Sequence, residues 1–157
     1  MPNTPCLVSE GATGFSMGSL ATGHRRGSGY GARPNGGCWP LSGGQGGVAY
    51  GLTGVSSSGP AYIYVLIEAL ADGGVRMGWP RAMAIKLAAQ TVKGATGMVL
   101  ETGEPPAILK DNVCSPGGLT IAAIESLEKN GFRSAAMQAV IAVASKSIEM
   151  RNAEEEK

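Results

Sequence analysis

The apolar residues from Gly51 onward recur at the spacings of amphipathic helices, whereas those of the first fifty residues follow no regular period. Proline and glycine separate the periodic stretches, because proline suits the first helical turn and glycine suits the end of a helix. The pattern therefore predicts five helices, which begin near Ser58, Trp79, Pro106, Gly118 and Arg133.

The same residues predict where these helices end. Gly73-Gly74 is expected to weaken or end the first helix, with Ser58 as its cap, and Asn130-Gly131 is expected to end the fourth. The second helix has a tail of small residues, Gly94 to Gly97. The fifth is expected to reach about Met150, before a charged tail that frays.

The second and fifth predicted helices are apolar over much of their circumference. The residues concerned include Met83, Ile85, Leu87, Ala88, Val92, Met137, Val140, Ile141 and Ala144. Such helices must be buried on several sides, and a helical unit of about 100 residues has few interior positions to provide that cover. We therefore expect an obligate dimer, and a monomeric bundle is the alternative.

The residues before Gly51 have a different character. The segment 24–50 reads HRRGSGYGARPNGGCWPLSGGQGGVAY, and no Asp or Glu occurs between Gly11 and Ile67. This composition predicts a flexible, disordered segment. A glycine-rich phosphate cradle is the alternative, although no GxxxxGK[ST] motif is present. Before this segment, Cys6-Leu7-Val8 is expected to be the end of a strand.

Charge and cysteine content exclude several classes of protein. The 157 residues include 13 basic and 12 acidic side chains, which predicts no binding to nucleic acid or to an anionic membrane. The longest apolar run, Pro60 to Leu70, contains Glu68 and is too short to span a bilayer. The three cysteines form no CxxC pair, so we expect no metal site and no disulfides. Met1 is followed by Pro-Asn-Thr-Pro, without a basic stretch and then an apolar one, so we expect no signal peptide.

The segment KDNVCSPGGLT is the most distinctive candidate for chemistry. Its proline and two glycines lead into a helix, whose first turn offers unpaired N–H groups and the positive end of the helix dipole. Ser115 and Thr120 add hydroxyl groups there. The pattern is typical of a site for a small anion, such as a carboxylate or phosphate. An ordinary capped helix start is the alternative.

Three stretches of the chain together resemble the pyrroline-5-carboxylate reductases. They are LKDNVCSPGGLTIAAIESLEKNGFR, GLTGVSSSGPAYIYVLIEALADGGVRMG and the beginning MPNTPC followed by Glu10-Gly11-Ala12. The resemblance implies a mainly α fold: a helical dimerisation and substrate-binding domain over 51–157, preceded by a remnant of an α/β dinucleotide-binding domain over 1–22. The glycine-rich segment 23–50 lies between them.

The resemblance also implies an activity, the reduction of 1-pyrroline-5-carboxylate to L-proline with NADH or NADPH. The residues implied to bind the substrate are Val113, Ser115, Gly117, Gly118, Leu119 and Thr120. The hydroxyl of Thr120 is implied to orient or protonate the ring nitrogen. Asn3, Thr4 and Pro5 are implied to lie beside the nicotinamide. A homo-oligomer, a dimer at least, and a cytoplasmic location are expected, with a mitochondrial location if a targeting segment precedes the chain.

Two departures from the family pattern leave other readings open. The strand–GxGxMG–helix unit of the family does not occur in this sequence, so a non-catalytic dimerisation module and a degraded gene product are alternatives to the enzyme. Segment 24–50 lacks the helix, the strand and the carboxylates that the family has there.

We hypothesise that segment 24–50 is translated out of frame between two compensating insertions or deletions, because Gly, Arg, Pro and Ala have GC-rich codons. Reading the source transcript in all three frames is expected to show a helix-forming peptide with Glu in one alternative frame. If neither alternative frame encodes such a peptide, the hypothesis is wrong.

Overall fold

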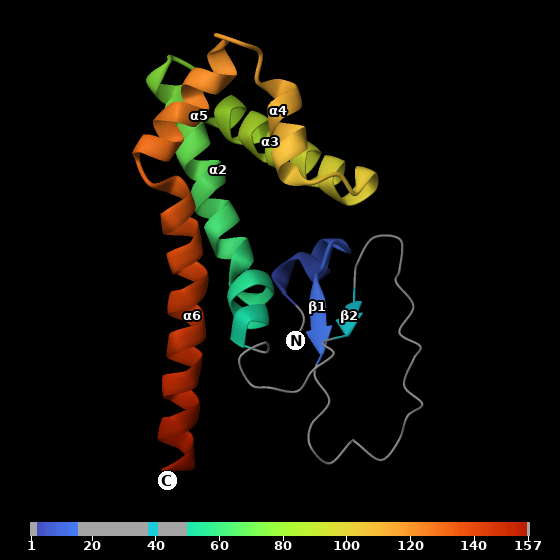
Figure 1. The fold of residues 1–157 in the computed structure, drawn as a ribbon, viewed down its shortest axis with the longest axis vertical. Coiled ribbons are helices and arrows are strands. Elements are labelled where there is room, and N and C mark those ends of the chain that lie inside the picture. The colour runs from blue at the N-terminus through green and yellow to red at the C-terminus, as the bar shows by residue number, and fades with distance from the viewer. Residues whose placement is uncertain (1–2, 16–37, 41–49, 157) are drawn as a thin grey trace. The chain divides into compact units, whose positions relative to one another are not determined.

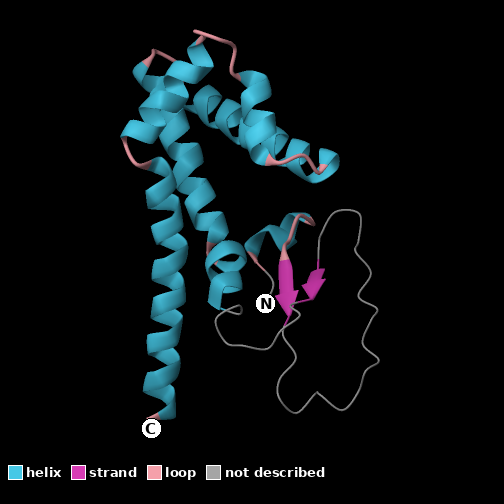
Figure 2. Ribbon diagram, viewed as in Figure 1, coloured by secondary structure: helices cyan, strands magenta, loops and turns pink. Residues whose placement is uncertain are grey.

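The structure of this chain is a computed structural model that describes residues 3–15, 38–40 and 50–156 (Figure 1). Most of the described residues are helical (Figure 2). The five α-helices of this part are α2 (Gly59–Arg76), α3 (Arg81–Thr102), α4 (Pro106–Val113), α5 (Leu119–Lys129) and α6 (Phe132–Glu155). The chain forms two compact units, Ile63–Ala135 and the combination of Met1–Tyr62 with Ala136–Lys157.

The predicted mainly α fold and its five helices are confirmed, with small differences at the helix ends. The first helix was expected to weaken or end at Gly73-Gly74, but α2 continues through this pair to Arg76. A glycine within a helix costs only about 1 kcal/mol relative to alanine, and packing can offset that cost. Gly74 has such a packing role, because a Cβ atom there would lie 3.2 Å from the Trp79 ring.

The unit Ile63–Ala135 contains a tight connection between α2 and α3. Gly78 has a φ of 95°, a left-handed conformation that glycine adopts without strain. The Trp79 N–H then donates to the Gly74 carbonyl at 3.0 Å, which brings the indole over α2. Arg81, at the start of α3, forms an ion pair with Asp72 of α2. The prediction that Trp79-Pro80 precedes the second helix is therefore confirmed.

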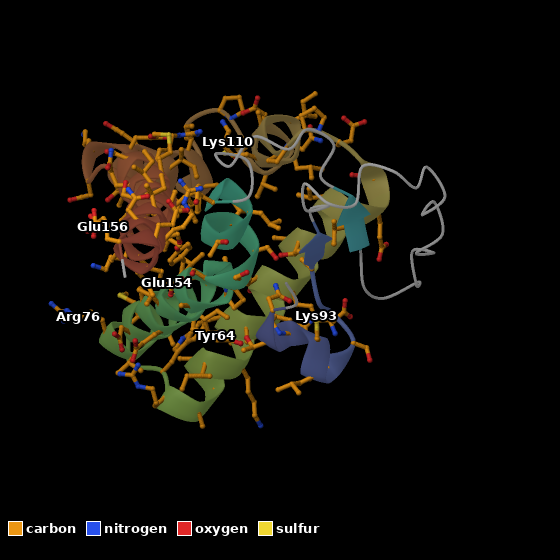
Figure 3. The ribbon with its side chains drawn as sticks, turned by 90° about the horizontal axis from the view of Figure 1, so that it is seen from below. Tyr64, Arg76, Lys93, Lys110, Glu154 and Glu156 are labelled. Carbon is orange, nitrogen blue, oxygen red and sulfur yellow. The ribbon has the colours of Figure 1, made fainter. Side chains whose placement is uncertain are left out.

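The buried apolar core of this unit is small. It consists of Ala71, Ala84 and Ala88, with Ile67 and Val75 partly buried against it. Among the described residues no large side chain is fully buried. Large apolar residues are instead exposed along the helices, as Tyr64 of α2 illustrates at 59% exposure (Figure 3). One copy of the chain therefore leaves much of its apolar helical surface uncovered.

In the other unit, the C-terminal part of α6 packs against the residues that precede α2. The ideal Cβ position of Gly54 lies 2.8 Å from the Val140 carbonyl oxygen, so only a residue without a side chain fits there. The Tyr62 hydroxyl donates to the Ala139 carbonyl at 3.4 Å. The guanidinium of Arg151 lies over the Tyr50 ring, 5.6 Å from its centre. Backbone proximity and one cation–π contact thus hold α6 in place here.

The residues before α2 correct two local expectations. Cys6-Leu7-Val8 is the end of a 3₁₀ helix, η1 (Thr4–Val8), and not of a strand. Pro5 favours this outcome, since its fixed φ suits the first turn of a helix. Ser58 has helical dihedral angles because a π-helical turn, η3 (Thr53–Ser57), runs directly into α2. An N-cap residue has a non-helical conformation, so Ser58 is not the cap that we expected.

Two short strands are described within the first fifty residues. Strand β1 (Thr13–Phe15) pairs in parallel with β2 (Cys38–Pro40), with Thr13 opposite Cys38. The expectation of disorder over 23–50 otherwise falls outside the described residues. In the described part of the chain, no helix has both the length and the apolar character needed to cross a membrane.

Candidate functional site

The predicted anion site lies at the connection between α4 and α5. Helix α4 ends at Val113, and the Cys114 N–H caps it by donating to the Asp111 carbonyl at 3.0 Å. The chain then turns tightly, because the Gly118 N–H donates to the Ser115 carbonyl at 3.0 Å. Helix α5 begins at the next residue, Leu119.

Both glycines of this turn are required by its geometry. Gly117 has a φ of 65°, which is left-handed and costly for residues with a side chain. Gly118 is the N-cap of α5 and has an extended backbone, with φ −82° and ψ 178°. A Cβ atom at Gly118 would lie 2.2 Å from the Ser115 hydroxyl oxygen and 3.1 Å from its carbonyl oxygen. The absence of a side chain at Gly118 therefore gives the Ser115 hydroxyl its place beside the helix start.

The first turn of α5 has no acceptor from its own N-cap, because glycine has no side chain. The N–H groups of Leu119 and Thr120 belong to the orphan donors of a helix start, where the helix dipole is positive. No acidic residue lies in this first turn. The arrangement therefore favours binding of an anion, with the Ser115 hydroxyl as a further donor.

The charged residues at the end of α4 pair with each other. Lys110, labelled in Figure 3, lies 2.5 Å from the Asp111 carboxylate. The hydrogen bond and the charge of Asp111 raise the pKa of Lys110 above its ordinary value. The ammonium therefore stays protonated at neutral pH, and Asp111 offsets its charge.

The apolar residues of the predicted site are open to solvent. Val113 is 66% exposed and Leu119 is 93% exposed, while Thr120 is half-buried in the first turn of α5. All six residues predicted to bind substrate thus occur in one short stretch around the helix start. The stretch combines backbone donors, two hydroxyl groups and apolar side chains that a bound molecule would cover.

The three residues predicted to lie by the cofactor occur in the other compact unit. Asn3 precedes η1, and Thr4 and Pro5 form its first turn. The Asn3 carboxamide bonds to the backbone of Ala12 and Ser56, neither of which the sequence marks as its partner. Thr4 is exposed. In the described parts of the chain, no group of three or more His, Cys, Asp or Glu side chains is arranged to hold a metal ion.

The sequence of this chain is similar to a family of reductases. A family profile described as pyrroline-5-carboxylate reductase dimerisation matches residues 50–150. A pyrroline-5-carboxylate reductase of Arabidopsis thaliana is 47% identical over 150 residues, which is 96% of this chain and 54% of the relative. That of Escherichia coli is 45% identical over an alignment 158 positions long, which covers 94% of this chain and 54% of the relative. The chain therefore spans about half the length of these curated relatives.

Solved structures that are similar to this chain are also pyrroline-5-carboxylate reductases. A pyrroline carboxylate reductase of Plasmodium falciparum with NADP bound superposes with a TM-score of 0.76 at 35% identity, covering 96% of this chain and 61% of that one. A pyrroline-5-carboxylate reductase of Coxiella burnetii has a TM-score of 0.80 at 30% identity, covering 95% of this chain and 55% of the other.

The left-handed turn at Gly117 predicts the effect of adding a side chain there. We expect Gly117→Ala to lower the free energy of unfolding by about 1 kcal/mol, because alanine is strained at positive φ. Gly73→Ala is the matched control, since a Cβ atom at Gly73 in α2 would meet open space. Thermal unfolding followed by circular dichroism compares the two. Gly73→Ala should be at least as stable as the unaltered chain, and a Gly117→Ala protein that is also as stable as the unaltered chain would contradict the role of this turn.

Proposed function

The chain belongs to the pyrroline-5-carboxylate reductase family, and we propose that it serves the reduction of 1-pyrroline-5-carboxylate to L-proline. The observation that best supports this proposal is the helix start at Gly118, which offers a place for one carboxylate within the residues matched by the family profile. The substrate has one such carboxylate, attached to a small ring that apolar side chains can cover.

The proposed reaction needs binding and orientation more than it needs a strong base. The reduced nicotinamide of NADPH or NADH supplies a hydride to the carbon of the C=N bond. The electrons of that bond pass to the ring nitrogen, which keeps the proton of a protonated imine. The chain then has to fix the carboxylate and the ring, because holding reactants in place supplies much of the rate.

Each residue of the helix start has a proposed part in this arrangement. The carboxylate lies on the orphan N–H groups of the first turn of α5, at Leu119 and Thr120, beside Gly118, which has no side chain to block it, and it accepts a bond from the Ser115 hydroxyl. Gly117 shapes the turn. Val113 and Leu119 cover the ring, which would remove from water two side chains that one copy leaves exposed. The Thr120 hydroxyl orients or protonates the ring nitrogen.

The cofactor is proposed to approach the segment Asn3 to Pro5, with the nicotinamide beside the exposed first turn of η1. Support comes from the Plasmodium falciparum relative, whose structure contains NADP. We propose a cytoplasmic location for the reaction.

We further propose that the helical domain forms a homodimer. Helix α3 leaves Met83, Ile85, Leu87, Met98 and Leu100 more than two-fifths exposed, and α6 leaves Met137 and Ile141 more than half exposed. Full burial of an exposed side chain of this kind contributes roughly 1.5–3 kcal/mol, and covering the part of each that is still exposed contributes a fraction of that, so a second copy that covers several of them would stabilise the fold. The matched family profile is itself described as a dimerisation domain.

The activity is tested by mixing the purified chain with NADPH and pyrroline-5-carboxylate and following the absorbance of the reduced cofactor. Turnover above background would support the proposed activity, and Thr120→Ala is then expected to lower it at least about tenfold, because a positioned acid or donor typically contributes that much or more. Thr96→Ala is the matched control, since the Thr96 hydroxyl only donates to the Val92 carbonyl within α3.

The outcomes separate the proposed enzyme from its alternative. Binding of a proline analogue without any turnover would favour a non-catalytic dimerisation module. Unchanged turnover in Thr120→Ala would remove Thr120 from the site. A loss of the same size in Thr96→Ala would show that the effect is not specific to the helix start.

The dimer is tested by light scattering coupled to size exclusion at several protein concentrations. We expect at least a dimer, with a thermal midpoint that rises with concentration, because association stabilises the folded state by mass action. Ile141→Asp should shift the equilibrium toward the monomer. Lys146→Ala on the same helix is the control, since Lys146 is exposed and contacts only Glu149 in a surface pair. A concentration-independent monomer would contradict the proposal.

A further inference from the structure

The side chain of Asn3 is occupied within the chain. Its carboxamide oxygen accepts the Ala12 N–H at 3.0 Å, and its nitrogen donates to the Ser56 carbonyl at 3.1 Å. The two partners are backbone groups of fixed polarity, one donor and one acceptor. They therefore determine which end of the carboxamide faces which partner. Neither end is turned toward open space.

A third hydrogen bond closes the arrangement. The Ser56 hydroxyl donates to the Ala12 carbonyl at 2.8 Å. Ala12 is thus held through its N–H by Asn3 and through its carbonyl by Ser56, and Asn3 and Ser56 are bonded to each other. Ser56 is only 8% exposed, so these bonds form where water competes little. We call this group of three residues the Asn3 clasp.

The sequence around Ser56 explains why an outside donor is needed there. In a regular helix the Ser56 carbonyl would accept an N–H from residue 60, four positions later. Residue 60 is proline, which has no N–H. The next N–H along the helix, that of Ala61, donates instead to the Ser58 carbonyl at 3.0 Å. A buried carbonyl without a partner costs about 1–3 kcal/mol, and the Asn3 amide is the donor that satisfies the Ser56 carbonyl.

The turn between Asn3 and Ala12 is shaped to return to the clasp. The Glu10 N–H donates to the Pro5 carbonyl at 3.1 Å, which reverses the chain after η1. Gly11 is buried, and a Cβ atom there would lie 2.0 Å from the Cys6 sulfur. Only glycine lets the chain fold back this closely, so η1 and Ala12 are held side by side.

We infer that Asn3 is a positioning residue, whose carboxamide fastens the turn from Asn3 to Ala12 onto the helical turn Thr53–Ser57 and does not itself contact the nicotinamide. The catalytic consequence of this inference rests on the proposed function. Within that function, Asn3 holds η1 in place and does not bind the cofactor itself. The surface offered to the cofactor is then the exposed face of η1, including Thr4, whose place the clasp fixes.

The clasp is tested first without reference to activity, by amide hydrogen exchange. Asn3→Ala is expected to speed exchange of the Ala12 N–H about tenfold, because it removes the acceptor of that group. Leu7→Ala in the same 3₁₀ helix is the control, since Leu7 is 90% exposed and takes no part in the clasp. Unchanged exchange at Ala12 in Asn3→Ala would overturn the inference.

The positioning role is tested by a double-mutant cycle of Asn3→Ala and Ser56→Ala, read as kcat/KM for NADPH. The buried Ser56 hydroxyl, which Ser56→Ala removes, bonds to the Ala12 carbonyl, so both single variants should lose kcat/KM and the double variant should lose no more than the worse single one. Losses that multiply would indicate a direct contact of Asn3 and overturn the inference. If the unaltered chain shows no turnover, the proposed function fails, and the exchange experiment still decides whether the clasp exists.

Discussion

Burial of apolar surface is the constraint on which the helical part of this chain depends. Helices of this composition are stable in water only when their apolar faces are covered, because intrinsic helix propensity contributes little. In the described residues, the buried apolar core consists of three alanine side chains, and the larger apolar residues of α3 and α6 stay partly exposed. Small residues let the helices approach closely, but they bury little area, so most of the stabilisation has to come from outside one copy. Folding and association of this domain are therefore expected to be coupled.

The helices were predictable because proline and glycine mark their boundaries. Gly78, Gly103 and Gly131 all have positive φ values at helix ends, as the sequence suggested for the last of them. The predicted helix boundaries were wrong where a residue type that often ends or caps a helix has another role in this fold. Gly74 reads as a helix terminator, yet it lies within α2 and gives the Trp79 ring its place. Ser58 reads as a cap, yet the preceding residues are already helical. In these cases tertiary contacts decided the local structure, and a single sequence does not display such contacts.

The turn that leads into α5 was predictable for a different reason, while its binding of a substrate stays a prediction. The residues SPGG specify this turn, because its backbone requires glycine at positions 117 and 118. The helix start that follows leaves N–H groups without partners, as every helix start does. The Asn3 clasp was not predictable in this way, because Asn3 and Ser56 are 53 positions apart and only the fold brings them together. One signal was present in the sequence: Pro60 follows Ser56 by four positions and leaves its carbonyl without the usual donor. That signal indicates that a donor is needed and does not identify it.

The π-helical turn Thr53–Ser57 has a consequence for how this region tolerates insertion and deletion. Its i to i+5 bond, from the Ser58 N–H to the Thr53 carbonyl, accommodates one residue more than an α-helical turn would. Each residue of an α-helix advances the chain by about 100° around the axis. Deleting one residue of this turn would rotate the preceding residues about the helix axis by roughly that angle. They would then no longer face Val140 and Arg151 on α6. The extra residue thus sets the rotational phase that brings Gly54 and Tyr50 to face α6.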